Sequence, residues 1–296
     1  MIRYIFIGFV LLAVFSCKEI DSPITEPSNI KIEAGACLDE LKDDELDIVT
    51  WNLQKFPLLS HSPQYVDDII IQMDADIIAV QEIGSAFALE EVLAYIRETG
   101  WKGRLHGSGD LKLGFLYNSN KVELSTLKIE FDDDKDAFPR PVIKTKVTPN
   151  PEIFGDTTEL FLLNVHLKCC EGEENENRRR KAMSRIKSYV DGFHPDDMVV
   201  ITGDFNDVLD APEANNIFTS FLNDSPNYSI ADLDIATGNN LFWSYPSFPS
   251  HLDHFIISNE LFSNVENVKT IIIEDCVPDY DEVVSDHRPV LLSLDL

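Results

Sequence analysis

The sequence predicts an α/β fold, a four-layer sandwich in which two packed mixed β-sheets are flanked by helices. Two observations support this prediction. From Glu45 onward, short β-branched runs alternate with helix-like segments, and some runs are almost wholly apolar whereas others alternate apolar and polar residues. The chain also lacks the patterns G-x-G-x-x-G and G-x-x-x-x-G-K-[ST]. A mixture of buried strands and hairpins fits two packed sheets better than a doubly wound nucleotide-binding sheet.

In the first part of the domain, residues 46–99, the sequence pattern predicts two units, each a strand followed by a helix. Residues 46–53 ("LDIVTWNL") read as a strand, and residues 62–73 as a helix with Pro63 in its first turn. Residues 75–82 ("ADIIAVQE") are nearly all apolar, as in a strand that is covered on both faces. A second helix is expected over residues 85–99, ending near a glycine.

The middle of the chain predicts antiparallel strands and then one further strand–helix–strand unit. The alternating stretches are "KLGFLYN" (112–118), "KVELSTLKIEF" (121–131) and "RPVIKTKVT" (140–148). After them we expect a strand over 158–167, a helix with a basic stripe over 174–193 and a buried strand over 197–205.

In the last third of the chain, short apolar strands again alternate with helix-like segments. We expect a helix near 212–222, followed by strands in "LDHFIIS" (252–258), "NVKTIIIE" (267–274) and the terminal "RPVLLSLDL". Residues 45–296 contain no internal repeat and no linker, so they predict one domain, within the size range of single α/β domains.

The chain of 296 residues is strongly acidic. It has 24 Lys plus Arg and 52 Asp plus Glu, a formal net charge of −28. Such a charge opposes passive, non-specific binding to nucleic acid or to an anionic membrane. An enzyme that binds a divalent cation is not excluded, because the metal reverses the local field around a phosphate.

The N-terminus resembles a bacterial lipoprotein signal. Arg3 precedes an apolar run from Tyr4 to Phe15, which is shorter than a membrane-spanning helix and is followed by Ser16-Cys17. We expect residues 1–17 to be this signal, with Cys17 lipidated, and residues 18–44 to be a flexible acidic tether before the domain. An ordinary cleaved signal or an uncleaved anchor is the alternative. The prediction places the protein outside the cytoplasm, on a bacterial outer membrane or cell surface, anchored by lipid.

Four further cysteines, Cys37, Cys169, Cys170 and Cys276, are an even number, which in an exported chain suggests disulfides. Three pairings are possible. A bond between the adjacent Cys169 and Cys170 would be strained, so we expect each of these two to pair elsewhere, with free thiols as the alternative.

Polar side chains recur where the predicted apolar strands begin or end. A lone polar residue there is usually a cap, but this set shares only a few residue types, and strand ends on one edge of a sandwich meet at one rim. The set is Asn52, Glu82, His166, Asp204, Asn206, Asp253, His254, Asp286 and His287. Its hard oxygen ligands suit Mg²⁺, Mn²⁺ or Ca²⁺, and it contains no nucleophilic Ser or Cys. Metal-assisted attack of water on phosphorus is the simplest chemistry for such a set.

Six stretches, in order along the chain, carry a resemblance to a known family. They are "TWNLQ" (50–54), "AVQEI" (79–83), "LNVHLK" (163–168), "TGDFND" (202–207), "HLDHFIIS" (251–258) and "SDHRPV" (285–290). Together they resemble the endonuclease/exonuclease/phosphatase superfamily, which includes deoxyribonuclease I-like nucleases, abasic-site endonucleases and neutral sphingomyelinases. The resemblance spans nearly the whole of residues 45–296.

The resemblance implies a role for each matching residue. Asn52, Glu82 and Asp286 would hold the metal, Mg²⁺ or else Mn²⁺ or Ca²⁺. Asp204 would orient or deprotonate the attacking water, and Asn206 would position water and phosphate. His287 would contact the scissile phosphate, with its tautomer fixed by Asp253. His166 would touch the phosphate or the leaving group, whereas we read His254 as a packed neighbour.

The sequence departs from relatives at three places. Gln54 stands where abasic-site endonucleases carry an acidic residue, and His251 stands where many relatives have Arg. "GDFNDV" lacks the aromatic residue and Arg of inositol-phosphate 5-phosphatases, which makes that subgroup a poor match.

We therefore expect an exported, monomeric, metal-dependent phosphodiesterase, first of all a nuclease acting on DNA or RNA. A sphingomyelin or phospholipid phosphodiesterase, which suits a membrane tether and the aromatic stretch 239–251, is the main alternative. A phosphomonoesterase and a non-catalytic phosphate-binding surface protein are further alternatives. The basic stripe Arg178, Arg179, Arg180, Lys181, Arg185 and Lys187 either guides a polyanion or is a solvated face that balances nearby acids.

Overall fold

The computed structural model describes residues 37–38, 41–155, 158–213 and 215–296. The predicted lipoprotein segment with Cys17 and most of the predicted tether lie outside these ranges. Within the ranges, no helix combines the length and the apolar character that crossing a membrane requires. The described residues all belong to one compact unit.

The first sheet has six strands, and its centre is the parallel pair β1 and β2. Helix α1 (Ser62–Met73) connects these two strands, and the other neighbours in the sheet are antiparallel. The strand order is β12 (Val265–Thr270), β13 (Val290–Leu294), β1 (Leu46–Phe56), β2 (Ile77–Ile83), β4 (Lys112–Asn118) and β3 (Trp101–His106).

The second sheet repeats this plan around the parallel pair β8 and β9, which the long helix α4 (Glu173–Phe193) connects. Its order is β10 (Tyr228–Ile230), β11 (Asp253–Ser258), β9 (Val199–Asp204), β8 (Leu160–His166), β7 (Val142–Pro149) and β5 (Val122–Leu124). The short strand β6 (Lys128–Glu130) also pairs with β7. Both sheets are mixed, as the sequence predicts.

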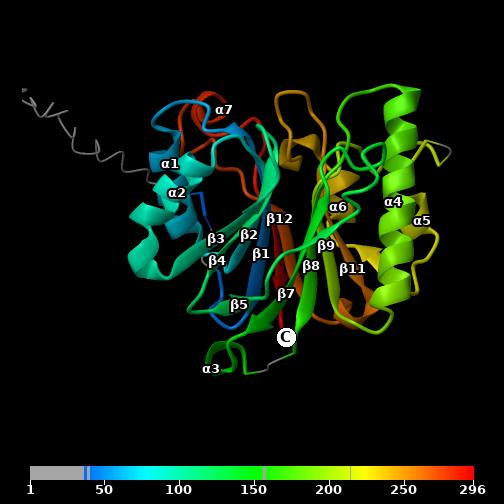
Figure 1. The fold of residues 1–296 in the computed structure, drawn as a ribbon, viewed down its shortest axis with the longest axis horizontal. Helices are drawn as coiled ribbons and strands as arrows, with labels where there is room; N and C mark the ends of the chain where they lie inside the picture. The colour runs from blue at the N-terminus through cyan, green and yellow to red at the C-terminus, as the bar shows by residue number, and fades with distance from the viewer. Residues whose placement is uncertain (1–36, 39–40, 156–157, 214) are drawn as a thin grey trace, which may run out of the picture. The chain divides into compact units, whose positions relative to one another are not determined.

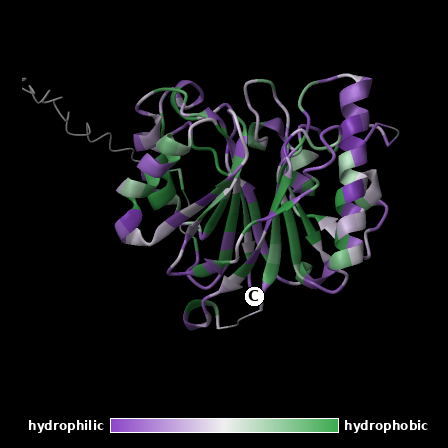
Figure 2. Cartoon of the chain, viewed as in Figure 1, coloured by the Kyte–Doolittle hydropathy of each residue, from purple (hydrophilic) through white to green (hydrophobic). Residues whose placement is uncertain are grey.

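The two sheets pack face to face through one apolar cluster that takes side chains from both of them, among them Ile77, Phe115, Leu162, Phe255 and Leu292. Helix α1 and α2 (Ala86–Tyr95) cover the outer face of the first sheet, and α4 covers the outer face of the second (Figure 1). Figure 2 shows apolar strands in the centre and a largely polar outer surface on α4. The four-layer α/β sandwich predicted from sequence is therefore confirmed.

The buried face of α4 explains why this helix packs where it does. Its buried residues include Ala182, Met183, Ile186 and Val190, which follow the spacing of one helical face. They belong to an apolar cluster with strand residues of the second sheet. The remaining short helices are α3 (Pro151–Phe154), α5 (Thr219–Leu222), α6 (Leu233–Ala236) and α7 (Tyr280–Val283).

Several predicted elements differ from the observed ones. The helix expected near 212–222 is reduced to α5, because the Asn216 side chain bonds to the backbone of Leu209 and Phe218 and replaces helical hydrogen bonds. The strand expected over 121–131 is two short strands, β5 and β6. The strand expected over 267–274 ends at Thr270.

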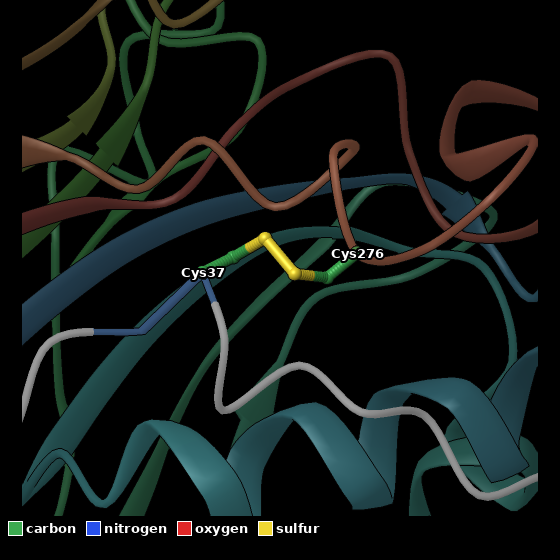
Figure 3. The surroundings of a disulfide bond; sticks show 2 residues. All are labelled: Cys37 and Cys276. Atoms are coloured by element: carbon green, nitrogen blue, oxygen red, sulfur yellow. A yellow bond between two sulfur atoms is a disulfide. The ribbon is translucent and has the colours of Figure 1, made fainter.

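A disulfide joins Cys37 to Cys276 (Figure 3). Cys37 belongs to the predicted tether, so this bond fixes a residue near the end of the tether to the domain. Cys169 and Cys170 are free thiols. Our expectation that each of these two pairs elsewhere is therefore wrong: Cys37 and Cys276 pair with one another and leave the adjacent cysteines without a distant partner.

Candidate active site

The ends of the two parallel strand pairs meet at one rim of the sandwich. Asn52 and Glu82 lie near the carboxyl ends of β1 and β2, and His166 and Asp204 are the last residues of β8 and β9. Asn52 Nδ2 donates to Asp204 Oδ2 at 2.9 Å, and His166 Nε2 lies 3.7 Å from Glu82 Oε1. These contacts cross from one sheet to the other. The sandwich thus brings together residues that are 152 positions apart in the first contact and 84 apart in the second.

The Asp204 carboxylate contacts three other residues of the rim, Asn52, Asn206 and His166. Its Oδ1 accepts from the backbone N–H of Asn206 at 2.8 Å, and its Oδ2 lies 3.5 Å from His166 Nε2. Burial, and then the neighbouring Asp253 carboxylate, raise the pKa of Asp204 to about 6. A carboxylate with this pKa is ionised at neutral pH and is a better proton acceptor than an exposed Asp.

His287 and Asp253 form a buried pair beside Asp204. His287 Nδ1 lies 2.8 Å from Asp253 Oδ2, and the Tyr245 ring lies with its centroid 4.8 Å from that of the His287 ring. Burial alone would lower the pKa of His287, but the Asp253 carboxylate, together with the charges of Asp204 and Asp286, outweighs burial and raises this pKa to about 10. His287 is therefore an imidazolium at neutral pH, with Nδ1 committed to Asp253.

His166 is buried and, unlike His287, is neutral at neutral pH. It is 3% exposed, and its Nδ1 has no hydrogen-bond partner within the described part of the chain. Burial, followed by the nearby Arg140 and His287 cations, holds the pKa of His166 well below its usual value. A neutral imidazole next to Glu82 and Asp204 can donate a hydrogen bond from one ring nitrogen and accept one at the other without adding charge to the rim.

The backbone at the rim is strained at three positions. Gln54, Glu82 and Asn206 have φ of 43°, 57° and 53°, in the left-handed region that residues other than glycine rarely adopt. Such conformations cost about 1–3 kcal/mol each and cluster at functional sites.

Asp286, Glu82 and Asn52 fit a divalent cation. Burial raises the pKa of Asp286, and the nearby Glu82 charge raises it further, against the His287 cation that lowers it. Two carboxylates beside an amide oxygen form a donor set for a hard cation, whose charge would offset the effect of Glu82 on Asp286. Asp286 is held by Gln54, which donates from Nε2 to Asp286 Oδ2 at 2.9 Å and accepts from the Asp286 N–H at 3.1 Å.

Sequence reasoning missed the roles of Gln54 and Arg140. We read Gln54 only as a departure from relatives, yet its side chain positions Asp286, and its N–H donates to Asn52 Oδ1 at 2.9 Å. Arg140 is half-buried, and burial lowers its pKa while the Asp204 charge raises it. Its Nε donates to the His166 carbonyl at 3.1 Å, and no ion pair joins it to an acid among the described residues. A single Arg before a predicted strand belongs to no motif, so the sequence does not indicate that Arg140 lies at the site.

His254 is fully buried in a separate cluster of polar side chains. Its Nδ1 is 2.6 Å from Asp232 Oδ2 and its Nε2 is 3.1 Å from the Asp207 carbonyl, so both ring nitrogens face acceptors. His251 Nε2 lies 3.1 Å from the same Asp232 oxygen, while His251 Nδ1 accepts from the Ser244 N–H. An Nδ1 that accepts leaves the proton on Nε2, which opposes metal binding there. This buried cluster connects loops that support the rim.

The basic stripe on α4 is neutralised by acids. Lys181 lies 3.1 Å from both Asp134 and Asp136, and Lys187 lies 2.7 Å from Asp224. Arg185 pairs with Asp134, Arg178 with Asp136, and the buried Arg179 with Asp207. These partners come from loops that pack against α4 rather than from residues 171–176. The stripe is therefore mainly a paired helix face and offers little attraction for a polyanion.

Comparison with known proteins agrees with this geometry. Residues 49–287 match the model of the Endonuclease/Exonuclease/phosphatase family. No curated protein matches the chain.

Solved structures with the same fold include three of different origin. TDP2 from D. rerio, solved with a single-strand DNA product, is 13% identical, with a TM-score of 0.63 over 86% of this chain and 100% of that one. An endonuclease/exonuclease/phosphatase from Bacteroides vulgatus is 15% identical, with a TM-score of 0.63 over 85% and 99%. The human Nocturnin catalytic domain, solved with a sulfate anion, is 15% identical, with a TM-score of 0.62 over 86% and 95%.

Proposed function

This chain belongs to the endonuclease/exonuclease/phosphatase family, and from that premise we propose that it is a metal-dependent phosphoric ester hydrolase. One observation carries the proposal. An ionisable carboxylate with a pKa of about 6, Asp204, and an imidazolium, His287, lie at the same rim beside a set of hard oxygen donors. A base, a cation and a metal-binding set are the parts that hydrolysis of a phosphoester by water requires.

Each side chain has a role in this proposal that follows from its contacts. Asp204 orients the attacking water and accepts its proton, while Asn206, held by the Asp204 carboxylate, positions water and phosphate. His287 donates from Nε2 to a phosphate oxygen, because Asp253 occupies its Nδ1. His166 contacts the phosphate or the leaving group. Arg140, which lacks an acidic ion-pair partner in the described ranges, adds positive charge beside His166.

Asn52, Glu82 and Asp286 would hold the metal, with Mg²⁺ first and Mn²⁺ or Ca²⁺ as alternatives. When bound, the ion supplies Lewis-acid stabilisation of charge on the phosphate. Gln54 supports this set through its two hydrogen bonds to Asp286. Removal of Gln54 should therefore weaken metal binding without removing a ligand.

A nuclease is the first candidate. It is supported by the likeness in fold to TDP2, whose structure contains a single-strand DNA product. The paired state of the α4 stripe argues that such a nuclease recognises its substrate at the rim rather than along the helix. Endonucleolytic action would convert supercoiled plasmid to linear products, whereas an exonuclease would leave closed circles intact.

A phospholipid or sphingomyelin phosphodiesterase is the second candidate, favoured by an apolar loop next to the rim. The chain from Ile235 to Leu252 contains no Asp, Glu, Lys or Arg, and Leu241 and Phe248 are 66% and 68% exposed. Arg288 holds this loop by donating to the Leu241 and Trp243 carbonyls. An uncharged, rigidly held apolar loop suits a lipid surface.

One set of assays distinguishes these candidates. Purified residues 18–296 with Mg²⁺ or Mn²⁺ would be tested side by side on plasmid DNA, RNA, sphingomyelin vesicles and simple phosphate monoesters. The nuclease proposal expects cleavage of DNA or RNA, and the variant Phe248→Ser separates the two candidates. It should reduce turnover of vesicles while sparing a soluble phosphodiester. Hydrolysis of no substrate in the presence of metal would favour a non-catalytic phosphate-binding protein.

We further propose that the protein is exported and acts as a lipid-anchored monomer. The support is the N-terminal sequence pattern that ends at Cys17. Metabolic labelling with a radioactive fatty acid tests it: label on the wild type and none on Cys17→Ser is expected. Equal labelling of both chains would reject Cys17 as the attachment site.

A further inference from the structure

Two adjacent thiols lie just beyond the rim. Cys169 and Cys170 follow strand β8, which ends at His166, and their Sγ atoms are 2.8 Å apart. Cys170 is exposed to solvent and Cys169 is half-buried. A small molecule can therefore reach the pair, and neither sulfur has to travel to meet the other.

The backbone of this segment is fixed by a buried arginine. Arg179 is 4% exposed, and its Nη1 donates to the carbonyls of Lys168 and Cys170 at 2.9 and 3.0 Å. Its Nε donates to Asp207 Oδ2 at 2.8 Å. Cys170 has φ of 80°, in the left-handed region. The two cysteines are thus presented by a clamped turn rather than by a loose loop.

The two thiols differ in their surroundings. Lys168 Nζ lies 3.6 Å from Cys169 Sγ, which places a positive charge next to that sulfur. The hydrogen bond between the two thiols, and then burial, raise the pKa of Cys170. Cys170 therefore keeps its proton more firmly, and Cys169, with the Lys168 ammonium beside its sulfur, is the one placed to attack first.

We propose that Cys169 and Cys170 form a redox-active dithiol that small-molecule disulfides oxidise to a reversible vicinal disulfide. The Cα atoms of adjacent residues in a trans peptide are ~3.8 Å apart, below the ~4.4–6.8 Å that is usual for disulfides. Strain of this kind makes a disulfide easier to reduce, so the bond is suited to switching rather than to permanent cross-linking.

The chemistry balances through a mixed disulfide. The Cys169 thiolate attacks one sulfur of a disulfide R–S–S–R, which forms a Cys169–S–S–R bond and releases RS⁻, which takes up a proton. Cys170 then loses its proton and attacks the Cys169 sulfur, which expels the second RS⁻. In total the two thiols lose two protons and two electrons, and R–S–S–R becomes two RSH.

The oxidised pair would act on the rim through the residues between it and His166. The Leu167 carbonyl accepts from Asn206 Nδ2 at 3.3 Å and from Arg140. Closing a strained ring two residues further on shifts this carbonyl and with it the two side chains it holds. This consequence rests on the proposed function, whereas formation of the disulfide does not.

The test is a redox titration read by mass. The purified protein is equilibrated with glutathione at graded ratios of thiol to disulfide, quenched in acid, alkylated with N-ethylmaleimide and digested. The peptide that contains both cysteines should change from two alkyl groups to none, with the loss of two hydrogens, and should recover both when reduced glutathione is restored. The Cys37–Cys276 bond should stay oxidised over the same range.

Two single variants serve as matched controls. Cys169→Ser and Cys170→Ser each leave one thiol with no neighbour to displace glutathione, so each should accumulate a stable glutathione adduct that the wild type does not. A stable adduct on the wild type, or two alkylated thiols at every ratio, would overturn the proposal.

An activity measurement addresses the consequence separately. Oxidation should lower the rate of the wild type about tenfold, in line with the sensitivity of catalysis to small displacements, and leave the double variant Cys169→Ser/Cys170→Ser unchanged. Ring closure without a change in rate would refute the effect on the rim but not the dithiol. If neither protein hydrolyses a phosphoester, the proposed function fails while the mass result still stands.

Discussion

His287 Nδ1 lies 2.8 Å from Asp253 Oδ2, and this contact joins the first residue of β11 in one sheet to the segment that precedes β13 in the other. Together with the charges of Asp204 and Asp286, the Asp253 carboxylate more than offsets the effect of burial and raises the pKa of His287 to about 10. The same bond leaves Nε2 as the donor that faces the rim. Asp253 thus sets the direction of the imidazolium and contributes most of the charge that keeps it protonated.

The first prediction concerns the pH dependence of hydrolysis. Activity requires ionised Asp204, with a pKa of about 6, and protonated His287, with a pKa of about 10, so the rate should rise through pH 6 and fall near pH 10. Asp253→Asn removes the charge that raises the pKa of His287. Its alkaline limb should move down by several pH units, as measured by kcat/KM from pH 5 to 11.

The same pair makes a prediction for stability. The folded-state pKa of His287 lies above its ordinary value of 6.5, so the stabilisation is fully present below pH 6.5 and is lost as pH rises towards 10. Over that window, the difference in unfolding free energy between wild type and His287→Gln should shrink in urea titrations. A constant difference would mean that the pair does not titrate there.

The second prediction concerns Gly203, the strand residue before Asp204. Gly203 has φ of 137°, and a Cβ there would lie 2.0 Å from the Val165 carbonyl oxygen. Gly203→Ala should lower the free energy of unfolding by at least about 2 kcal/mol. Gly192→Ala is the matched control, because a Cβ there meets nothing within 4 Å, and alanine in α4 should stabilise by about 0.5–1 kcal/mol. Equal effects in urea denaturation would contradict this reading.

The third prediction concerns the basic face of α4. Lys181→Gln/Lys187→Gln removes two cations that are already paired with aspartates, so the dependence of DNA cleavage on salt should not change. Each lost phosphate contact would reduce the slope of log rate against log salt by about 0.9. Arg140→Gln provides the comparison and should reduce it. If the slope of log rate against log salt falls for Lys181→Gln/Lys187→Gln and not for Arg140→Gln, then α4 does guide the substrate and the prediction is wrong.

The fourth prediction concerns the disulfide. Cys37 and Cys276 are 239 residues apart in sequence, so their bond closes a long loop in the unfolded chain. The double variant Cys37→Ser/Cys276→Ser should lose about 2–5 kcal/mol of stability. Its kcat at 25 °C should be unchanged, because neither cysteine lies at the rim. A specific loss of kcat with unaltered stability would place the bond in the catalytic machinery.

The sequence predicts the parts of the fold in which local pattern and burial agree. The helix at 62–73 and the strand at 112–118 match the observed bounds, because periodicity and turn residues there point the same way. Strand β3 ("WKGRLH") was missed because it is an edge strand with only Trp101 buried, and it shows no regular alternation. Edge strands depend on a neighbour for pairing, and that neighbour is not visible in the local pattern.

The rim was predictable to the extent that its residues stand at strand ends. Asn52, Glu82 and Asp204 could be collected this way, and the packing of the two sheets then brought them together. Gln54 could not, because its role depends on a left-handed backbone and on Asp286, far away in sequence. The neutralisation of the α4 stripe was equally hidden, since its partners lie on loops that only the fold brings near.

The central claim is that Asp204 is the base of a metal-dependent phosphoester hydrolysis, and one comparison tests it most directly. Wild type and Asp204→Asn would be assayed on a soluble phosphodiester and on DNA, with Mg²⁺ and with a chelator, after circular dichroism has shown that both are folded. The account predicts Mg²⁺-dependent hydrolysis by the wild type and a loss of at least about 10³-fold in kcat for the variant. A folded Asp204→Asn protein with wild-type activity would contradict it.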